Sequence, residues 1–209
     1  MKNQPSILVC GIGSIGIRHI NNLKKLDCQV LAWHYKPKIL NDKNLGTDIK
    51  KYKNLISAIQ DSSAVIIATP TNAHEHILTE ALKLNKPIFI EKPISHNLNF
   101  YDKTKIFTKN SLLEVGCNFR LHPNLIKLKK ILSRINQKDI LSYRLAHGYN
   151  LDLWRPSHKF KKSYSYDSKR GGGVLLDLIH QIDISLWLFG EIKSVYGNCS
   201  NTKSIGVKG

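Results

Sequence analysis

The chain has 209 residues, of which 42% are hydrophobic and 22% charged, as in an ordinary soluble globular protein with one large domain or two small ones. Its formal net charge is +17, but the lysines are scattered and form no dense basic arm, which disfavours nucleic acid as a partner. No stretch is long enough to span a membrane, and four widely spaced cysteines without a CxxC pair disfavour a metal site and a disulfide framework and fit a reducing cytoplasm.

The first predicted element is a buried strand that runs into a glycine-rich turn. Residues 7–16 read ILVCGIGSIG, and a helix is predicted to open at Ser14. Glycines let the backbone approach a pyrophosphate, and a helix N-terminus offers unpaired N–H groups and a partial positive charge. The turn predicts a dinucleotide site, although such turns also occur without any nucleotide. The candidate cofactor contacts are Gly11, Ile12, Gly13, Ser14, Ile15 and Gly16.

A second strand is predicted over residues 29–34 and completes a β-α-β unit. Such units often carry an acid about 20 residues beyond the glycines, where it binds the adenine ribose hydroxyls. No acid lies between this strand and Lys38; the strand end offers His34, Tyr35 and Lys36 instead. These side chains could attract a 2′-phosphate or could form a solvated loop. The sequence therefore favours NADP and leaves NAD open, with Tyr35 and Lys36 as candidate contacts.

The chain then alternates between helix and strand patterns. A loop is predicted over 37–47, a short helix over 53–59 and a buried strand over 64–69. Asn72 is predicted to cap the next helix. The apolar face of that helix is expected to consist of Ile77, Ala81 and Leu84.

A short strand over 88–90 leads into Glu91, Lys92 and Pro93. This order places the lysine at the carboxyl edge of the sheet, where open α/β sheets bind ligands. Because proline fixes the backbone next to it, the ammonium group is held by a stiff turn. Lys92 could stabilise negative charge on a substrate oxygen, or it could be a surface lysine at a strand end.

The second half of the chain is predicted to form a separate domain. A helix over 98–109 and a strand over 112–117 precede Arg120, which could bind a phosphate or a carboxylate or could form an interdomain salt bridge. The predicted domains are therefore residues 1–120 and 121–209. His122 and Pro123 begin a predicted amphipathic helix. Two further strands are expected, over 140–149 and 192–196.

Residues 150–170 are rich in aromatic and basic residues, including Trp154 and Arg155. This long loop could be functional, or it could be a solvated excursion. A single helix is predicted from the glycines at 171–173 to about Leu188. Asp177 and His180 are three apart and would share one face of it, where the pair could position a proton acceptor or be structural.

Taken together, five motifs resemble the glucose-fructose oxidoreductase, inositol dehydrogenase and MocA family (GFO/IDH/MocA). They are the glycine turn, ATPTNAH at 68–74, EKP at 91–93, GCNFRLHP at 116–123 and GGGVLLDLIHQID at 171–183. The resemblance implies an NAD(P)-dependent oxidoreductase that acts on a sugar, nucleotide sugar or cyclitol. It also implies an α/β fold, with an N-terminal Rossmann domain and a C-terminal α/β domain built on a mostly antiparallel sheet.

The resemblance also assigns roles to individual residues. His180 would be the catalytic base, Lys92 would stabilise the oxyanion and Asp177 would orient the sugar. Family members commonly place the acid and the histidine four apart; the spacing of three found here resembles members associated with surface-polysaccharide sugars. The implied further cofactor contacts are Thr69, Pro70, Asn72, His74, Glu91 and Lys92, and the implied substrate contacts are Asn118, Arg120, Trp154 and Arg155.

The chain stops at Gly209, whereas the family usually continues with further strands. We therefore expect an incomplete second domain. A fragment, a truncated reading frame and a naturally reduced member all fit. The alternative function is a catalytically inactive NAD(P)-binding homologue or sensor. A homo-oligomer is typical of the family, but the expected unpaired strand edges leave oligomerisation open.

Overall fold

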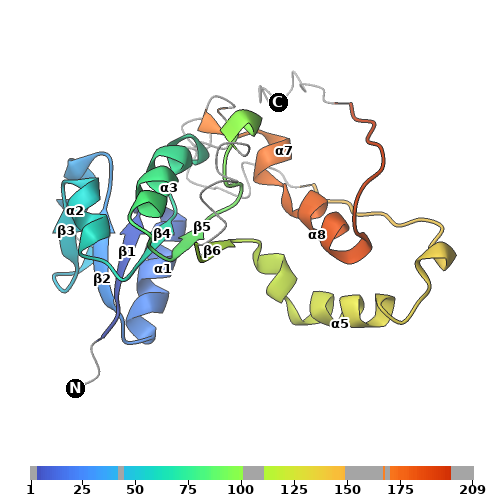
Figure 1. Cartoon of the computed structure of the whole chain (residues 1–209), viewed down its shortest axis with the longest axis horizontal. Helices are drawn as coiled ribbons and strands as arrows, with labels where there is room; N and C mark the ends of the chain where they lie inside the picture. Colours follow the sequence, from blue (N-terminus) through green and yellow to red (C-terminus); the bar gives the residue numbers. More distant parts are fainter. Residues whose placement is uncertain (1–3, 42–44, 101–110, 149–166, 168–169, 199–209) are drawn as a thin grey trace. The chain divides into compact units, whose positions relative to one another are not determined.

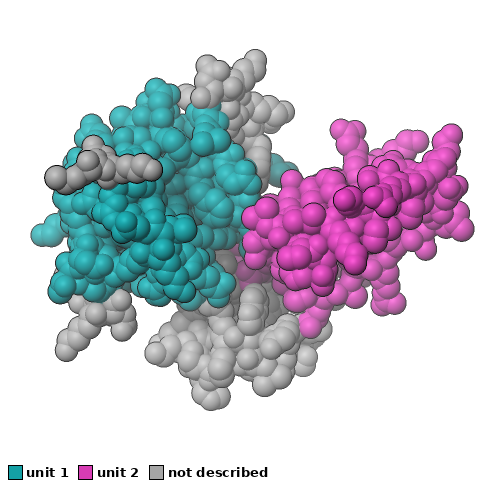
Figure 2. Space-filling view, turned by 90° about the horizontal axis from the view of Figure 1, so that it is seen from below, with its two compact units in different colours: residues 1–116 teal, residues 117–209 magenta. Residues whose placement is uncertain are grey.

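The computed structural model describes residues 4–41, 45–100, 111–148, 167 and 170–198. The chain divides into two compact units, residues 1–116 and 117–209, which Figure 2 colours separately.

The first unit is built on a six-stranded sheet, and every pair of neighbouring strands is parallel (Figure 1). The strand order is β3-β2-β1-β4-β5-β6, which is the order of a dinucleotide-binding Rossmann fold. The strands are β1 (Ser6–Cys10), β2 (Gln29–Trp33), β3 (Lys50–Tyr52), β4 (Ala64–Ile67), β5 (Ile88–Ile90) and β6 (Leu113–Val115).

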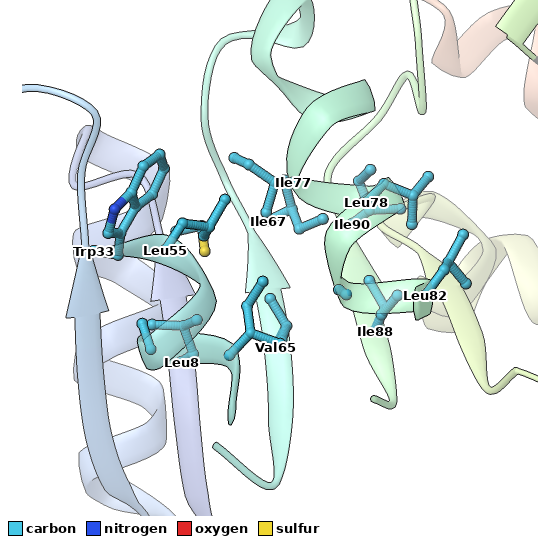
Figure 3. Close-up of a cluster of buried hydrophobic side chains, with 14 of the residues drawn as sticks. Leu8, Trp33, Leu55, Val65, Ile67, Ile77, Leu78, Leu82, Ile88 and Ile90 are labelled. Carbon is cyan, nitrogen blue, oxygen red and sulfur yellow. The ribbon is translucent and has the colours of Figure 1, made fainter. Parts of the chain in front are cut away.

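Helices cover both faces of this sheet because successive strand residues point to opposite sides. Leu8 of β1 packs against α2 and α3, while its neighbour Val9 packs on the opposite face against α1. Figure 3 shows the larger cluster, in which Ile77 and Leu78 of α3 lie beside Ile67 and Ile90. The helical elements of the unit are α1 (Ser14–Lys25), η1 (Pro37–Asn41), α2 (Leu55–Gln60), η3 (Thr71–Ala73) and α3 (His74–Lys83).

Most predicted elements of the first unit are confirmed, and two details are corrected. The short strand β3 falls between the predicted loop and helix, where the sequence KKY lacks the apolar run that marks an inner strand. Asn72 does not cap α3: residues 71–73 form a 3-10 turn, and the N-cap residue of α3 is Ala73, without a side-chain bond. Of the predicted helix over 98–109, residues 98–100 are helical and 101–110 lie outside the described residues.

The regular elements described in the second unit are all helical. Its elements are η5 (Asn118–Leu121), α5 (Pro123–Leu132), η6 (Gln137–Asp139), α7 (Val174–Asp177) and α8 (His180–Phe189). The start of α5 is as predicted, with His122 as its N-cap. Residues 140–148 and 192–196 were expected to be strands, but they pair with no other strand that the structure describes. A strand needs a hydrogen-bonded neighbour, and none is present among the described residues. The antiparallel sheet of this domain stays a prediction.

The prediction of one helix from residue 174 to 188 is wrong. The helix breaks at Leu178, whose φ of −104° and ψ of 26° depart from helical geometry. Leu178 N–H still donates to Val174 O at 3.0 Å, but Gln181 N–H donates to Leu178 O in a tighter turn. Asp177 is consequently the last residue of α7 and His180 the first of α8, so the two do not share one helix face.

Candidate functional site

The glycine turn connects β1 to α1 at the carboxyl edge of the sheet. Gly11 has a φ of +98°, which disfavours other residues, and a Cβ there would lie 2.6 Å from Ala68 O. A Cβ on Gly16 would lie 1.9 Å from Gly11 O. These two glycines therefore let the turn fold tightly between β1 and β4, at the point where the strand order reverses.

The outer side of the turn fits a dinucleotide phosphate. Gly13 is exposed, and nothing lies within 4 Å of the place where its Cβ would be. Gly13 is also the N-cap of α1, where no side chain caps the helix and the first turn holds no acid. The amide groups at this end are thus available to an anion and favoured by the helix dipole. Ser14 and Ile15 are exposed beside them.

A second polar group, the Thr69 hydroxyl, follows β4 at the point where the strand order of the sheet reverses. Thr69 is buried, and its Oγ1 has no hydrogen-bond partner in the part of the chain that the structure describes. A buried hydroxyl without a partner is unfavourable unless a ligand or water satisfies it. Pro70 and the exposed Asn72 follow it. The residues present therefore fit a bound dinucleotide.

The end of β2 forms a compact basic turn. The backbone N–H of Lys36 donates to His34 Nδ1 at 2.9 Å. The rings of His34 and Tyr35 stack with centroids 4.4 Å apart, and Lys36 Nζ lies 5.6 Å from the Tyr35 ring centroid. Burial lowers the pKa of His34, so its ring is neutral at physiological pH. The exposed groups here are the Tyr35 ring and the Lys36 ammonium.

Lys92 follows β5 at the same edge of the sheet, two strands away from the glycine turn. Neighbouring strands lie about 4.8 Å apart, so the strand axes of β1 and β5 are about 10 Å apart. Glu91, before the lysine, faces α1, because His19 Nε2 lies 2.9 Å from Glu91 Oε1. The peptide bond between Lys92 and Pro93 is cis.

His74 was assigned to the cofactor from the family motif, but its ring is engaged inside the protein. The residue is only 1% exposed, and its Nδ1 and Nε2 each lie 2.9 Å from a backbone carbonyl oxygen, those of Pro93 and Thr69. Burial lowers the pKa of His74 despite these two carbonyls. Its contacts join the chain beyond β4 to the chain beyond β5.

In the second unit, His180 lies against an aromatic ring. The Phe119 and His180 ring centroids are 4.6 Å apart with an interplanar angle of 37°. Asp177 is buried, on the other side of the helix break. The imidazole is thus held by α8 and by η5, which carries Phe119.

Arg120 binds a carboxylate of its own unit. Its Nε donates to both carboxylate oxygens of Asp183, at 3.1 and 3.0 Å. Asp183 stands three residues after His180 on α8, so this ion pair ties η5 to the helix that carries the histidine. Asn118 is exposed at the start of η5. Trp154 and Arg155 lie outside the described residues.

Sequence reasoning missed three residues that support these groups: His19, Phe119 and Asp183. Asp183 stands within the last quoted motif, and its spacing from His180 is a usable signal. His19 and Phe119 contact residues far along the chain, so no local pattern marks them. Among the described residues, no three histidine, cysteine or acidic side chains are grouped so that they could hold a metal ion. Within the same ranges, no helix is both long and apolar enough to cross a bilayer.

Two family descriptions match this chain. Residues 6–110 match "Oxidoreductase family, NAD-binding Rossmann fold" (GFO_IDH_MocA), and residues 129–208 match the "GFO/IDH/MocA C-terminal domain". Among curated relatives, myo-inositol 2-dehydrogenase of Thermotoga maritima is 30% identical over 92% of this chain and 57% of its own length. Scyllo-inositol 2-dehydrogenase (NAD(+)) of Bacillus subtilis is 29% identical over 95% of this chain and 58% of its own length.

Solved structures of similar fold are also named as dehydrogenases. A probable dehydrogenase from Thermotoga maritima aligns with a TM-score of 0.68 at 28% identity, over 90% of this chain and 56% of that one. Scyllo-inositol dehydrogenase from Lactobacillus casei, with bound NAD(H) and scyllo-inositol, aligns with a TM-score of 0.71 at 22% identity, over 90% of this chain and 57% of that one. The latter likeness concerns the fold alone. The chain spans a little over half the length of these relatives.

Proposed function

Because the chain belongs to the GFO/IDH/MocA family of oxidoreductases, we propose that it is an NAD(P)-dependent oxidoreductase acting on a ring hydroxyl of a sugar, nucleotide sugar or cyclitol. The names of the inositol dehydrogenases that it resembles favour a cyclitol. One observation carries the proposal: the open, uncapped N-terminus of α1 lies at the same sheet edge as Lys92. An anion site and a candidate catalytic cation thus share one edge of the sheet.

The glycine turn would hold the dinucleotide through its backbone. The amides at Gly13, Ser14 and Ile15 would donate to the pyrophosphate oxygens, and the orphaned Thr69 hydroxyl would find a partner in the ligand. The bound nicotinamide would supply the hydride acceptor or donor.

Lys92 would act on the oxygen of the reacting carbon. When the C–H bond of an alcohol breaks with loss of hydride, the hydroxyl oxygen must lose its proton and gains carbonyl character. An ammonium group beside that oxygen stabilises the negative charge that develops on it. The backbone of Glu91 is fixed to β4 by a 2.9 Å bond from its N–H to Ile67 O, so the lysine extends from an ordered strand end.

His180 would take the hydroxyl proton. A neutral histidine can accept a proton, and a positioned general base contributes about 10²- to 10⁴-fold in rate. The Phe119 ring restricts how the imidazole can turn. Asp177 would orient the sugar through its carboxylate.

We favour NADP as the cofactor. The support is that no acid lies at the end of β2, where the Lys36 ammonium and the Tyr35 ring are exposed instead. An ammonium group there would attract a 2′-phosphate much more strongly than an uncharged ribose hydroxyl. Lys36→Ala should weaken NADP⁺ binding several-fold and leave NAD⁺ binding unchanged. Lys25→Ala, at the opposite end of α1, is the matched control.

The test of the function measures binding and turnover separately. NADH and NADPH binding is followed by fluorescence on the purified chain, and cofactor reduction is followed with a panel of cyclitols, sugars and nucleotide sugars. Lys92→Met and His180→Ala should keep cofactor binding and lose turnover. Full activity in both variants would refute the assigned roles. Tight binding without turnover on any substrate would favour the alternative, an NAD(P)-binding homologue or sensor without catalytic activity.

A further inference from the structure

Beyond β4 and β5, the two strand ends share no further backbone hydrogen bond among the described residues. The ladder between them ends with the bond from Glu91 N–H to Ile67 O. Past this point each chain soon reaches a proline, Pro70 on one side and Pro93 on the other, and proline has no amide hydrogen to donate. A side chain can supply a further link between the two ends.

His74 supplies this link. Its Nε2 lies 2.9 Å from Thr69 O and its Nδ1 lies 2.9 Å from Pro93 O, so the imidazole spans the gap that the prolines leave. The ring is 1% exposed. It stands on the first turn of α3, which is seated on the sheet by Ile77 and Leu78 (Figure 3). The bridge is thus fixed to the core.

Lys92 lies between two anchored points. On one side, Glu91 N–H is bonded to β4; on the other, Pro93 O faces the His74 ring. We propose that His74 is a positioning residue, which sets the place of the Lys92 ammonium by joining the chain after β4 to the chain after β5. The proposal rests on the proposed function for the role of Lys92, but the position of Lys92 can be tested without it.

The ring makes one hydrogen bond and one packing contact across this gap. A neutral imidazole has one N–H, which donates to one of the two carbonyls according to its tautomer. Its rigid ring also fills the buried space between them. A second link farther along, between Ser95 Oγ and a carboxylate oxygen of Glu75, holds the following loop to the same helix turn. Removing the imidazole should therefore disturb the turn at Lys92 without releasing the whole loop.

The first experiment compares kinetic constants of the full chain and four variants: His74→Gln, His74→Leu, Lys92→Met and Ser62→Ala. Ser62 is a matched control, because it is also buried and donates to a backbone carbonyl, Ile59 O at 2.9 Å, but at the amino end of β4. His74→Leu should lower kcat about 10- to 100-fold, as expected when a reacting group is misplaced by about 1 Å. Its KM for the cofactor should change less than about 3-fold, which separates mispositioning from a loss of binding.

His74→Gln should recover part of the lost kcat, since its amide can still donate to one carbonyl. Ser62→Ala should lower the melting temperature and leave kcat unchanged. Equal kcat for His74→Leu and Ser62→Ala, with Lys92→Met inactive, would overturn the positioning role while the proposed function stands.

The second experiment needs no turnover. Lysines are reductively methylated with ¹³C-formaldehyde, and the Lys92 signal in the NMR spectrum is identified by its loss in Lys92→Met. We expect His74→Leu to shift or broaden this signal and Ser62→Ala to leave it in place. An unchanged signal in His74→Leu would overturn the proposal, whether or not the chain proves to be an enzyme.

Discussion

Replacing Gly13 with alanine should separate cofactor binding from stability. Gly13 has a φ of −79° and a ψ of −173°, an extended conformation that alanine also adopts, and nothing lies within 4 Å of the added Cβ. Gly→Ala at a compatible position raises the free energy of unfolding by about 0.4–1 kcal/mol, because alanine restricts the conformations of the unfolded chain. Alanine is a poorer helix cap than glycine, which costs a similar amount, about 0.7 kcal/mol. The melting temperature should therefore change by less than about 4 °C.

The effect on binding should be much larger. The added methyl group would stand in open space at the N-cap of α1, beside the amides that the proposed pyrophosphate would approach. Losing one hydrogen bond to a charged group costs about 1.5–3 kcal/mol, which weakens NADPH affinity about 10- to 150-fold.

The assay is a fluorescence titration with NADPH beside a thermal melt, with Gly16→Ala for comparison. A Cβ on Gly16 would lie 1.9 Å from Gly11 O, so that variant should lose about 1–3 kcal/mol of stability through overpacking. NADPH binding by Gly13→Ala as tight as that of the unaltered chain would refute this account of the turn.

Three further predictions concern stability. Leu78→Ala removes a fully buried side chain beneath α3 and should lower the free energy of unfolding by about 2–5 kcal/mol in a denaturant titration; Leu98→Ala, at an 82% exposed residue, should change it by less than about 0.5 kcal/mol. Asp183→Asn weakens the pair with the half-exposed Arg120 and should cost less than about 1 kcal/mol, a loss that high salt removes. Burial lowers the pKa of His74, so in mildly acidic solution the unfolded chain binds more protons than the folded chain. The contribution of His74 to the free energy of unfolding is therefore complete above about pH 6.5 and should fall as the pH drops toward the folded-state pKa. His74→Gln should flatten this slope in melts recorded from neutral to mildly acidic pH, and an unchanged slope would contradict it.

Local patterns in the sequence were sufficient to predict the glycine turn and the strand and helix on either side of it. The apolar run that ends in glycines predicts β1, the turn and α1. The apolar residues indicate a buried strand, and the glycines that follow them directly indicate a turn. The short edge strand β3 was missed because its sequence KKY carries charge where a core strand carries apolar residues. Asn72 suits a helix cap by residue type, but the 3-10 turn at 71–73 moves the cap to Ala73.

Contacts between distant residues could not be predicted. His19 and Glu91 are 72 residues apart, and Arg120 and Asp183 are 63 apart; each pair depends on how the elements pack. The helical spacing of Asp177 and His180 was misleading, because it assumes a continuous helix and the helix breaks at Leu178. For His74, the family motif suggested a cofactor contact, whereas the fold places its ring between two carbonyls.

Transfer of isotope from substrate to cofactor tests the central claim most directly. The full chain is incubated with NADP⁺ or NAD⁺ and with cyclitols or sugars deuterated at the ring carbons that bear hydroxyl groups, and the reduced cofactor is analysed by mass spectrometry. We predict that deuterium appears in the reduced nicotinamide with the unaltered chain and not with Lys92→Met, which still binds the cofactor. Equal transfer by Lys92→Met, or a chain that binds the cofactor but transfers no deuterium from any substrate, would contradict the claim.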